Sequence, residues 1–172
     1  APGVDVLAAV APPGNNDRNF DFYSGTSMSS PHIAGIAALI MQAHPDWSPM
    51  MVKSAIMTTA STQTNMEHAI PGGYFDYGAG QVVPNSAVDP GLVYDAGWNE
   101  WLAFLCGTSD AVGAGTCAAL ESMGYSTDPS DLNYPSIAIG ALAGEQTVER
   151  TVTNVGTPGT YAVSVDAPAG ID

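Results

Sequence analysis

The run from Gly25 to His32 reads Gly-Thr-Ser-Met-Ser-Ser-Pro-His and places a serine where an uncharged, apolar segment begins. Gly25 has no Cβ, so the backbone can turn sharply there and a substrate can lie close to it. At a helix start the first N–H groups have no intrahelical acceptor, and with the helix dipole they favour a developing oxyanion. We therefore interpret Ser27 as a nucleophile, with the backbone of Gly25, Thr26 and Ser27 supporting the oxyanion.

A helix is predicted after this turn, because residues 33–41 are apolar on every side, as in a helix enclosed within a large domain. Pro31 is compatible with the first turn of that helix. The alternative interpretation is a serine-rich helix cap without chemistry. A nucleophile elbow of the form G-x-S-x-G does not fit, since position 29 is serine.

The run 25–32, followed by Ile33-Ala34-Gly35, resembles the active-site serine motif of the subtilases, the subtilisin-like serine proteases. Segments 47–60, 77–95 and 131–156 also resemble plant-type subtilases. The resemblance implies an α/β fold: residues 1–95 as the C-terminal part of a parallel-sheet catalytic domain, 96–125 as a helical connection, and 126–172 as the truncated start of an all-β, fibronectin-type-III-like sandwich.

Local patterns predict several elements. Residues 4–10 form a short apolar run typical of a buried strand, and Ser48 with Pro49 is a good start for a second helix. Alternation over 145–155 and the run 161–165 predict antiparallel strands. Gly78 and Gly80 indicate close backbone approach; they are not a dinucleotide loop, because the third glycine and a βαβ unit are missing.

The composition excludes two classes of function. Three basic against 17 acidic residues give a formal charge of −14, which is incompatible with sequence-independent binding of nucleic acid. No apolar run reaches the roughly 18 residues that a membrane span needs. We expect a soluble, secreted, extracellular protein.

A serine hydroxyl needs a histidine to take its proton and an aspartate to orient the imidazole. In subtilases the chain order is Asp, His, Ser. The resemblance therefore implies that the Asp, the His and the oxyanion-hole Asn precede Ala1, and we expect a fragment that is inactive alone. None of the histidines in this sequence is a convincing base. His32 fits a capping or packing role, His44 lies at a helix end, and His68 lies in a polar loop.

Cys106 and Cys117 enclose a glycine-rich loop. In an extracellular protein, cysteines this close favour a disulfide over two buried free thiols. No further ligand residues cluster with them, so a zinc site is not expected. We assign no metal ligands and no cofactor, and the scattered acidic residues leave calcium binding open.

The leading hypothesis is a serine endopeptidase that cleaves protein or peptide substrates through an acyl-enzyme on Ser27. One alternative is a non-catalytic binding or structural module of a pseudoprotease. Another is a sedolisin-like acid peptidase, which pairs a similar Gly-Thr-Ser with Glu and Asp. His32 and the match over 77–95 disfavour that last hypothesis.

Overall fold

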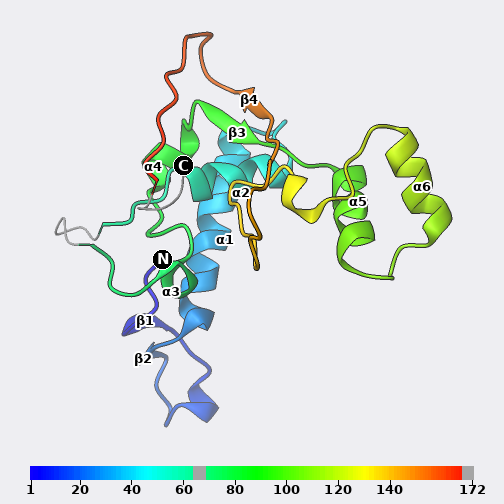
Figure 1. Cartoon of the computed structure of the whole chain (residues 1–172). Coiled ribbons are helices and arrows are strands. Elements are labelled where there is room, and N and C mark those ends of the chain that lie inside the picture. The colour runs from blue at the N-terminus through cyan, green and yellow to red at the C-terminus, as the bar shows by residue number, and fades with distance from the viewer. Residues whose placement is uncertain (64–68, 168–172) are drawn as a thin grey trace.

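A computed structural model describes residues 1–63 and 69–167 of the chain (Figure 1). The described chain contains helices and short strands. The elements are β1 (Val6–Ala9), η1 (Pro12–Gly14), β2 (Phe20–Tyr23), α1 (Thr26–Ala43), α2 (Pro49–Thr58), α3 (Tyr74–Tyr77), α4 (Pro84–Val88), β3 (Leu92–Tyr94), α5 (Trp98–Thr108), α6 (Ala114–Ser122), η2 (Pro129–Asp131) and β4 (Val152–Asn154).

The strand expected over residues 4–10 is present as β1, but the expectation of a buried strand in a parallel sheet is wrong for this chain. β1 pairs antiparallel with β2, with Leu7 opposite Phe22. These two side chains are 58% and 61% exposed. The described residues contain two two-stranded antiparallel sheets and no parallel pair. Because no described strand lies parallel to β1, its backbone groups pair with the segment that follows it.

The core lies where α1, α2 and α4 meet. Ile40, Val52 and Ala87 are buried together, and flanking apolar side chains of α1 and α2 pack against them. Only one side of α1 is covered, however: Leu39 is 63% and Met41 51% exposed. The helix forms as expected, but it is not enclosed, because α2 and α4 cover only one of its faces.

Helix α2 begins as the sequence predicts. The Ser48 hydroxyl accepts a hydrogen bond from the Met51 N–H at 3.0 Å, and Pro49 is the first helical residue. Within α2, Ser54 is completely buried, and its hydroxyl accepts from the Tyr94 N–H at 2.8 Å. This bond satisfies a buried polar group and ties α2 to β3.

β3 and β4 form a small antiparallel sheet between segments far apart in sequence, with Val93 opposite Thr153. The predicted strand over 145–155 is therefore reduced to β4, and residues 161–165 form no strand. The expected sandwich is absent from the described residues. A sandwich needs several strands that share an apolar face, whereas Val163 is 91% exposed here.

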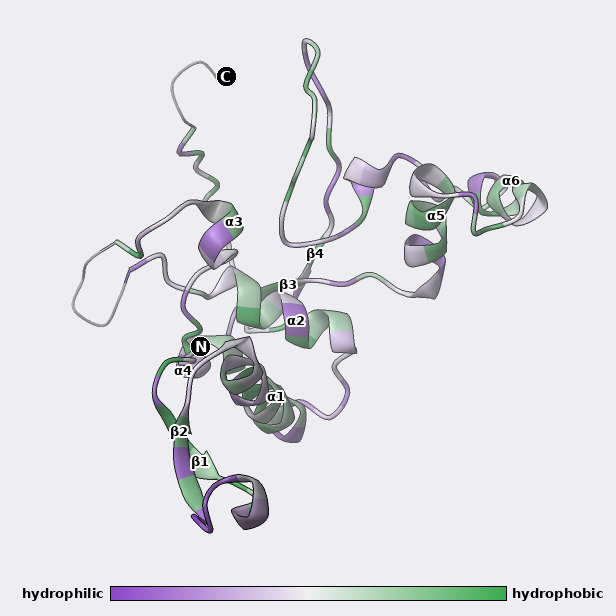
Figure 2. Cartoon of the chain, turned by 90° about the horizontal axis from the view of Figure 1, so that it is seen from below, coloured by the Kyte–Doolittle hydropathy of each residue, from purple (hydrophilic) through white to green (hydrophobic). Residues whose placement is uncertain are grey.

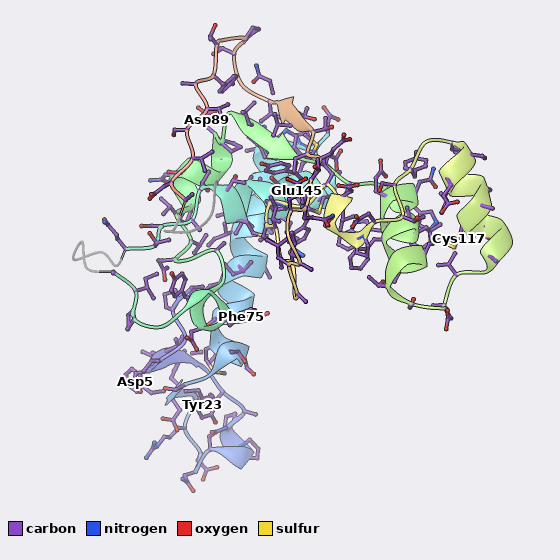
Figure 3. The ribbon with its side chains drawn as sticks, viewed as in Figure 1. Asp5, Tyr23, Phe75, Asp89, Cys117 and Glu145 are labelled. Atoms are coloured by element: carbon purple, nitrogen blue, oxygen red, sulfur yellow. A yellow bond between two sulfur atoms is a disulfide. The ribbon has the colours of Figure 1, made fainter. Side chains whose placement is uncertain are left out.

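α5 and α6 form a helical pair that projects to one side of the α1–α2 unit (Figures 1 and 2). A disulfide joins Cys106 on α5 to Cys117 on α6, the pairing favoured from the sequence (Figure 3). α5 is only partly buried: Ala103 is inaccessible, whereas Trp98 is 77% exposed.

Candidate active site

Ser27 is the second residue of α1, and the conformation of Gly25 sets the start of that helix. Gly25 has φ 149° and ψ 170°, a backbone conformation that strains a residue with a Cβ. The N–H groups of Met28 and Ser29 donate to the Gly25 carbonyl at 3.0 and 3.4 Å. The N–H groups of Thr26 and Ser27 precede the first intrahelical hydrogen bonds and lie at the positive end of the helix dipole.

The first residues of the chain support this turn. The Gly25 N–H donates to the Gly3 carbonyl at 2.7 Å. A Cβ on Gly3 would lie 2.1 Å from the Ser29 hydroxyl and 3.0 Å from the Gly25 carbonyl oxygen, so the two segments are in close contact. Beside them, the Ser24 hydroxyl accepts from the Asp5 N–H at 2.9 Å and donates to the Asp5 carboxylate at 3.3 Å.

A groove of about 350 Å³ opens beside Ser27, between β1 and the first two turns of α1. Ser27 is exposed, so its hydroxyl is accessible to a molecule in this groove. The other residues that line it are Val6, Leu7, Ala8, Met28, Pro31 and His32. The groove is thus mainly apolar, with one hydroxyl and one imidazole. In Figure 2, hydrophobic colour follows both strands of the adjoining hairpin, interrupted by Asp21.

The histidines do not form a hydrogen bond with Ser27 in the described structure. His32 Nδ1 lies 2.7 Å from the Met28 carbonyl, and since a carbonyl can only accept, Nδ1 carries the proton. His44 stacks on Trp47 at 4.0 Å between ring centroids, and its Nε2 contacts the Val88 carbonyl at 2.7 Å. His68 lies outside the described residues. The structure brings Ser27 to a helix N-terminus and brings no base to it.

Within residues 1–63 and 69–167, no group of His, Cys, Asp and Glu side chains is arranged to hold a metal ion. None of the helices in the same ranges combines the length and hydropathy needed to cross a bilayer.

An exposed serine in the first turn of a helix, with backbone N–H groups beside it and an apolar groove in front, has part of the arrangement that a serine-nucleophile hydrolase needs. Comparison with known families agrees with this class. The model of the subtilase family matches residues 1–98, and that of a fibronectin type-III domain matches residues 131–172. The chain belongs to the subtilase family.

Several curated relatives come from plants. Subtilisin-like protease SBT2.5 of Arabidopsis thaliana is 42% identical over 90% of the chain and 22% of its own length. Subtilisin-like protease SBT4.9 of the same plant is 45% identical, with 92% and 24% covered. Subtilisin-like protease Glyma18g48580 of Glycine max is 42% identical, with 99% and 24% covered. The chain therefore spans about a quarter of the length of these relatives.

Residues outside the run 25–32 also hold the turn, and they were not identified from the sequence. Gly3 contacts Gly25, and Asp5 contacts Ser24, each across about twenty positions. Asp5 has a left-handed φ of 51°, which the local sequence pattern does not predict. The only sequence signal for this contact was Gly3 itself. A glycine that is not needed for a local turn indicates that another segment approaches closely.

Proposed function

We propose that the complete protein is a serine endopeptidase in which Ser27 attacks the carbonyl carbon of a peptide bond. An acyl-enzyme forms on the Ser27 oxygen as the amine leaves, and water then releases the acid. The single observation that carries this proposal is the exposed Ser27 hydroxyl in the first turn of α1, next to backbone donors held by Gly25.

The catalytic contribution of this chain is positional and electrostatic. The N–H groups at Thr26 and Ser27 would donate to the oxygen that becomes negative in the tetrahedral intermediate, where removal of one donor typically costs about 100- to 1000-fold in kcat. The aspartate, the histidine and the side-chain oxyanion donor would come from the rest of the protein. A chain that spans about a quarter of its relatives leaves room for them.

An open apolar groove is consistent with a catalytic domain that continues beyond this chain. It measures about 470 Å³ and lies across α1, α2 and the segment 79–82, with Ile33, Ala37 and Ile56 among its walls. Together with the exposed Leu39 and Met41, this surface would be costly to leave in water, at about 25 cal/mol for each Å² of apolar area. We propose that the remainder of the catalytic domain covers it.

The same proposal divides the chain at residues 95 and 125. Residues 1–95 would complete the catalytic domain, 96–125 would connect it, and 126–172 would begin the fibronectin-type-III-like domain. The family matches, which end at 98 and resume at 131, support this division. The disulfide between Cys106 and Cys117 supports an extracellular location, because such bonds persist in oxidising compartments.

A fluorophosphonate probe that reacts with activated serines tests the proposal. The complete protein should be labelled at Ser27, and the 172-residue chain alone should not be, because neither histidine among its described residues is bonded to the hydroxyl. Labelling of the isolated chain at a similar rate would show that the activating groups lie within it. No labelling of the complete protein would favour the non-catalytic module, for which the absence of a bond between Ser27 and a described histidine is the supporting observation.

A further inference from the structure

A further pocket is distinct from the groove at Ser27 and from the apolar groove over α1 and α2. It lies where α2, α5 and η2 meet the segment that follows η2. Its volume is about 270 Å³. Its walls combine aromatic rings with cationic side chains. The residues that matter here are Lys53, Trp101, Phe104, Tyr134 and Arg150.

The aromatic wall is ordered by edge-to-face contacts. The Trp101 ring lies 5.9 Å from Phe104 and 6.2 Å from Tyr134 between centroids, and both pairs are close to perpendicular. Trp101, Phe104 and Tyr134 are each partly exposed, so their ring surface faces an accessible space. A flat apolar group entering the pocket would therefore meet aromatic surface.

The charge of this pocket opposes that of the whole protein. The chain has three basic residues and a formal charge of −14, yet two of the three, Lys53 and Arg150, both line this pocket. Lys53 also borders the apolar groove over α1 and α2. The third, Arg18, forms an ion pair with Asp21, and it is the only ion pair among the residues that the structure describes.

Neither cation of the pocket is therefore neutralised by a described carboxylate. Arg150 donates to the backbone carbonyls of Ser130 and Tyr134 at 2.6 and 2.9 Å, which fixes its guanidinium but leaves its charge. The Lys53 ammonium lies 4.6 Å from the centre of the Tyr134 ring. Lys53 is exposed, and its ammonium keeps donors for an incoming anion.

We propose that this pocket binds a carboxylate carried on an aromatic body, with the Lys53 ammonium as the direct partner of the carboxylate. The ring of the ligand packs against Trp101 and Phe104, and the fixed charge of Arg150 adds to the local potential. Because the rest of the protein repels anions, binding depends on these two cations at short range. The source of the carboxylate is either a small aromatic acid or the C-terminus of a peptide that ends in phenylalanine. This site does not depend on the proposed peptidase activity.

Binding of hydrocinnamate to the full-length protein, measured by saturation-transfer NMR and calorimetry, tests the proposal. Hydrocinnamamide has the same ring and no charge, and it should bind about tenfold more weakly, as expected for loss of a charge-assisted hydrogen bond. Acetyl-Gly-Phe, compared as the free acid and as the amide, tests a peptide C-terminus as the source of the carboxylate in the same way. A preference for either free acid over its amide supports the site and identifies the source of the carboxylate.

The matched variants are Lys53→Gln and Arg18→Gln, which remove one positive charge each. Lys53→Gln should weaken binding of the preferred acid about fivefold or more, whereas Arg18→Gln should leave it nearly unchanged. A thermal unfolding curve for each variant establishes that it is folded. Equal binding of acid and amide in both arms, or equal loss in the two variants, would overturn the proposal.

Discussion

The Gly25 N–H donates to the Gly3 carbonyl at 2.7 Å, so the segment before β1 holds the turn that presents Ser27. This contact joins two glycines that lie 22 positions apart, and one of them carries the φ of 149° that starts α1. Backbone contacts therefore help to set the position of Ser27, the proposed nucleophile.

Gly3→Ala should disturb this turn. The new methyl group would meet the backbone oxygen of Gly25 at 3.0 Å and the Ser29 hydroxyl at 2.1 Å, and only the hydroxyl can rotate away. We expect a loss of about 1 kcal/mol in the free energy of unfolding and a larger fractional loss in kcat than in binding, because Ser27 moves. Steady-state kinetics and thermal unfolding of the complete protein measure both. Gly115→Ala, where a Cβ meets nothing within 4 Å, is the control and should leave kcat unchanged.

Asn133 joins the segment after β3 to the segment before β4. Its amide group donates to the carbonyls of Asp95 and Thr151 at 2.7 and 2.9 Å and accepts from the Thr151 N–H at 2.9 Å. Asn133→Ala should lower the free energy of unfolding by about 2 kcal/mol, because several backbone groups lose a partner at once. Asn99→Ala, which removes one bond of 3.2 Å to the Tyr125 hydroxyl, should cost less than half of that. Equal losses in chemical denaturation would contradict this role for Asn133.

The disulfide between Cys106 and Cys117 closes a loop with a sequence separation of 11. Replacing both cysteines by serine should lower the free energy of unfolding by about 3 kcal/mol in the chain-entropy model. Denaturant titration of the variant, and of the native protein with and without reductant, measures this loss. If reduction leaves the unfolding midpoint of the native protein unchanged, the bond does not stabilise the α5–α6 pair.

The stability of the fold at the start of η2 depends on pH through the carboxylate of Asp128. The hydroxyl and N–H of Ser130, together with Gln146, donate to its carboxylate and hold the pKa of Asp128 below its ordinary value. A lowered folded-state pKa means that the carboxylate stabilises the fold above the unfolded-state pKa of about 3.9 and loses this effect as pH falls through the folded value. NMR titration should find a low Asp128 pKa, and Asp128→Asn should remove the corresponding acid-dependent change in η2. A titration midpoint at or above the ordinary value would contradict these contacts.

Local sequence patterns predicted α1 and α2, because the signals for these helices are local. Ser48 and Pro49 define the start of α2 by a cap and a fixed φ, and the apolar run after Ser27 continues as α1. The expectation of close backbone approach is confirmed at Gly80, where a Cβ would lie 2.3 Å from the Ser61 carbonyl oxygen. It is wrong at Gly78, where a Cβ would meet nothing within 4 Å. The residue types at these positions leave few other conformations.

Burial and strand pairing could not be predicted in the same way. The apolar pattern of residues 4–10 indicates a strand that is covered on both faces, but a local pattern does not specify which elements would cover it. Leu7 and Phe22 therefore lie exposed on a two-stranded hairpin. Likewise, alternation over 145–155 indicates strand propensity, and only the three residues opposite β3 find a partner. The pocket formed by Lys53, Tyr134 and Arg150 joins positions almost a hundred residues apart and has no local signal.

The central claim concerns the Ser27 hydroxyl, and peptide hydrolysis by the complete protein tests it most directly. Ser27→Ala should lower kcat by several orders of magnitude, because substrate binding alone cannot replace the attacking hydroxyl group. Ser30→Ala, which removes an exposed hydroxyl one turn along the same helix, should retain activity close to that of the native protein. Undiminished hydrolysis by the Ser27→Ala variant would contradict the account.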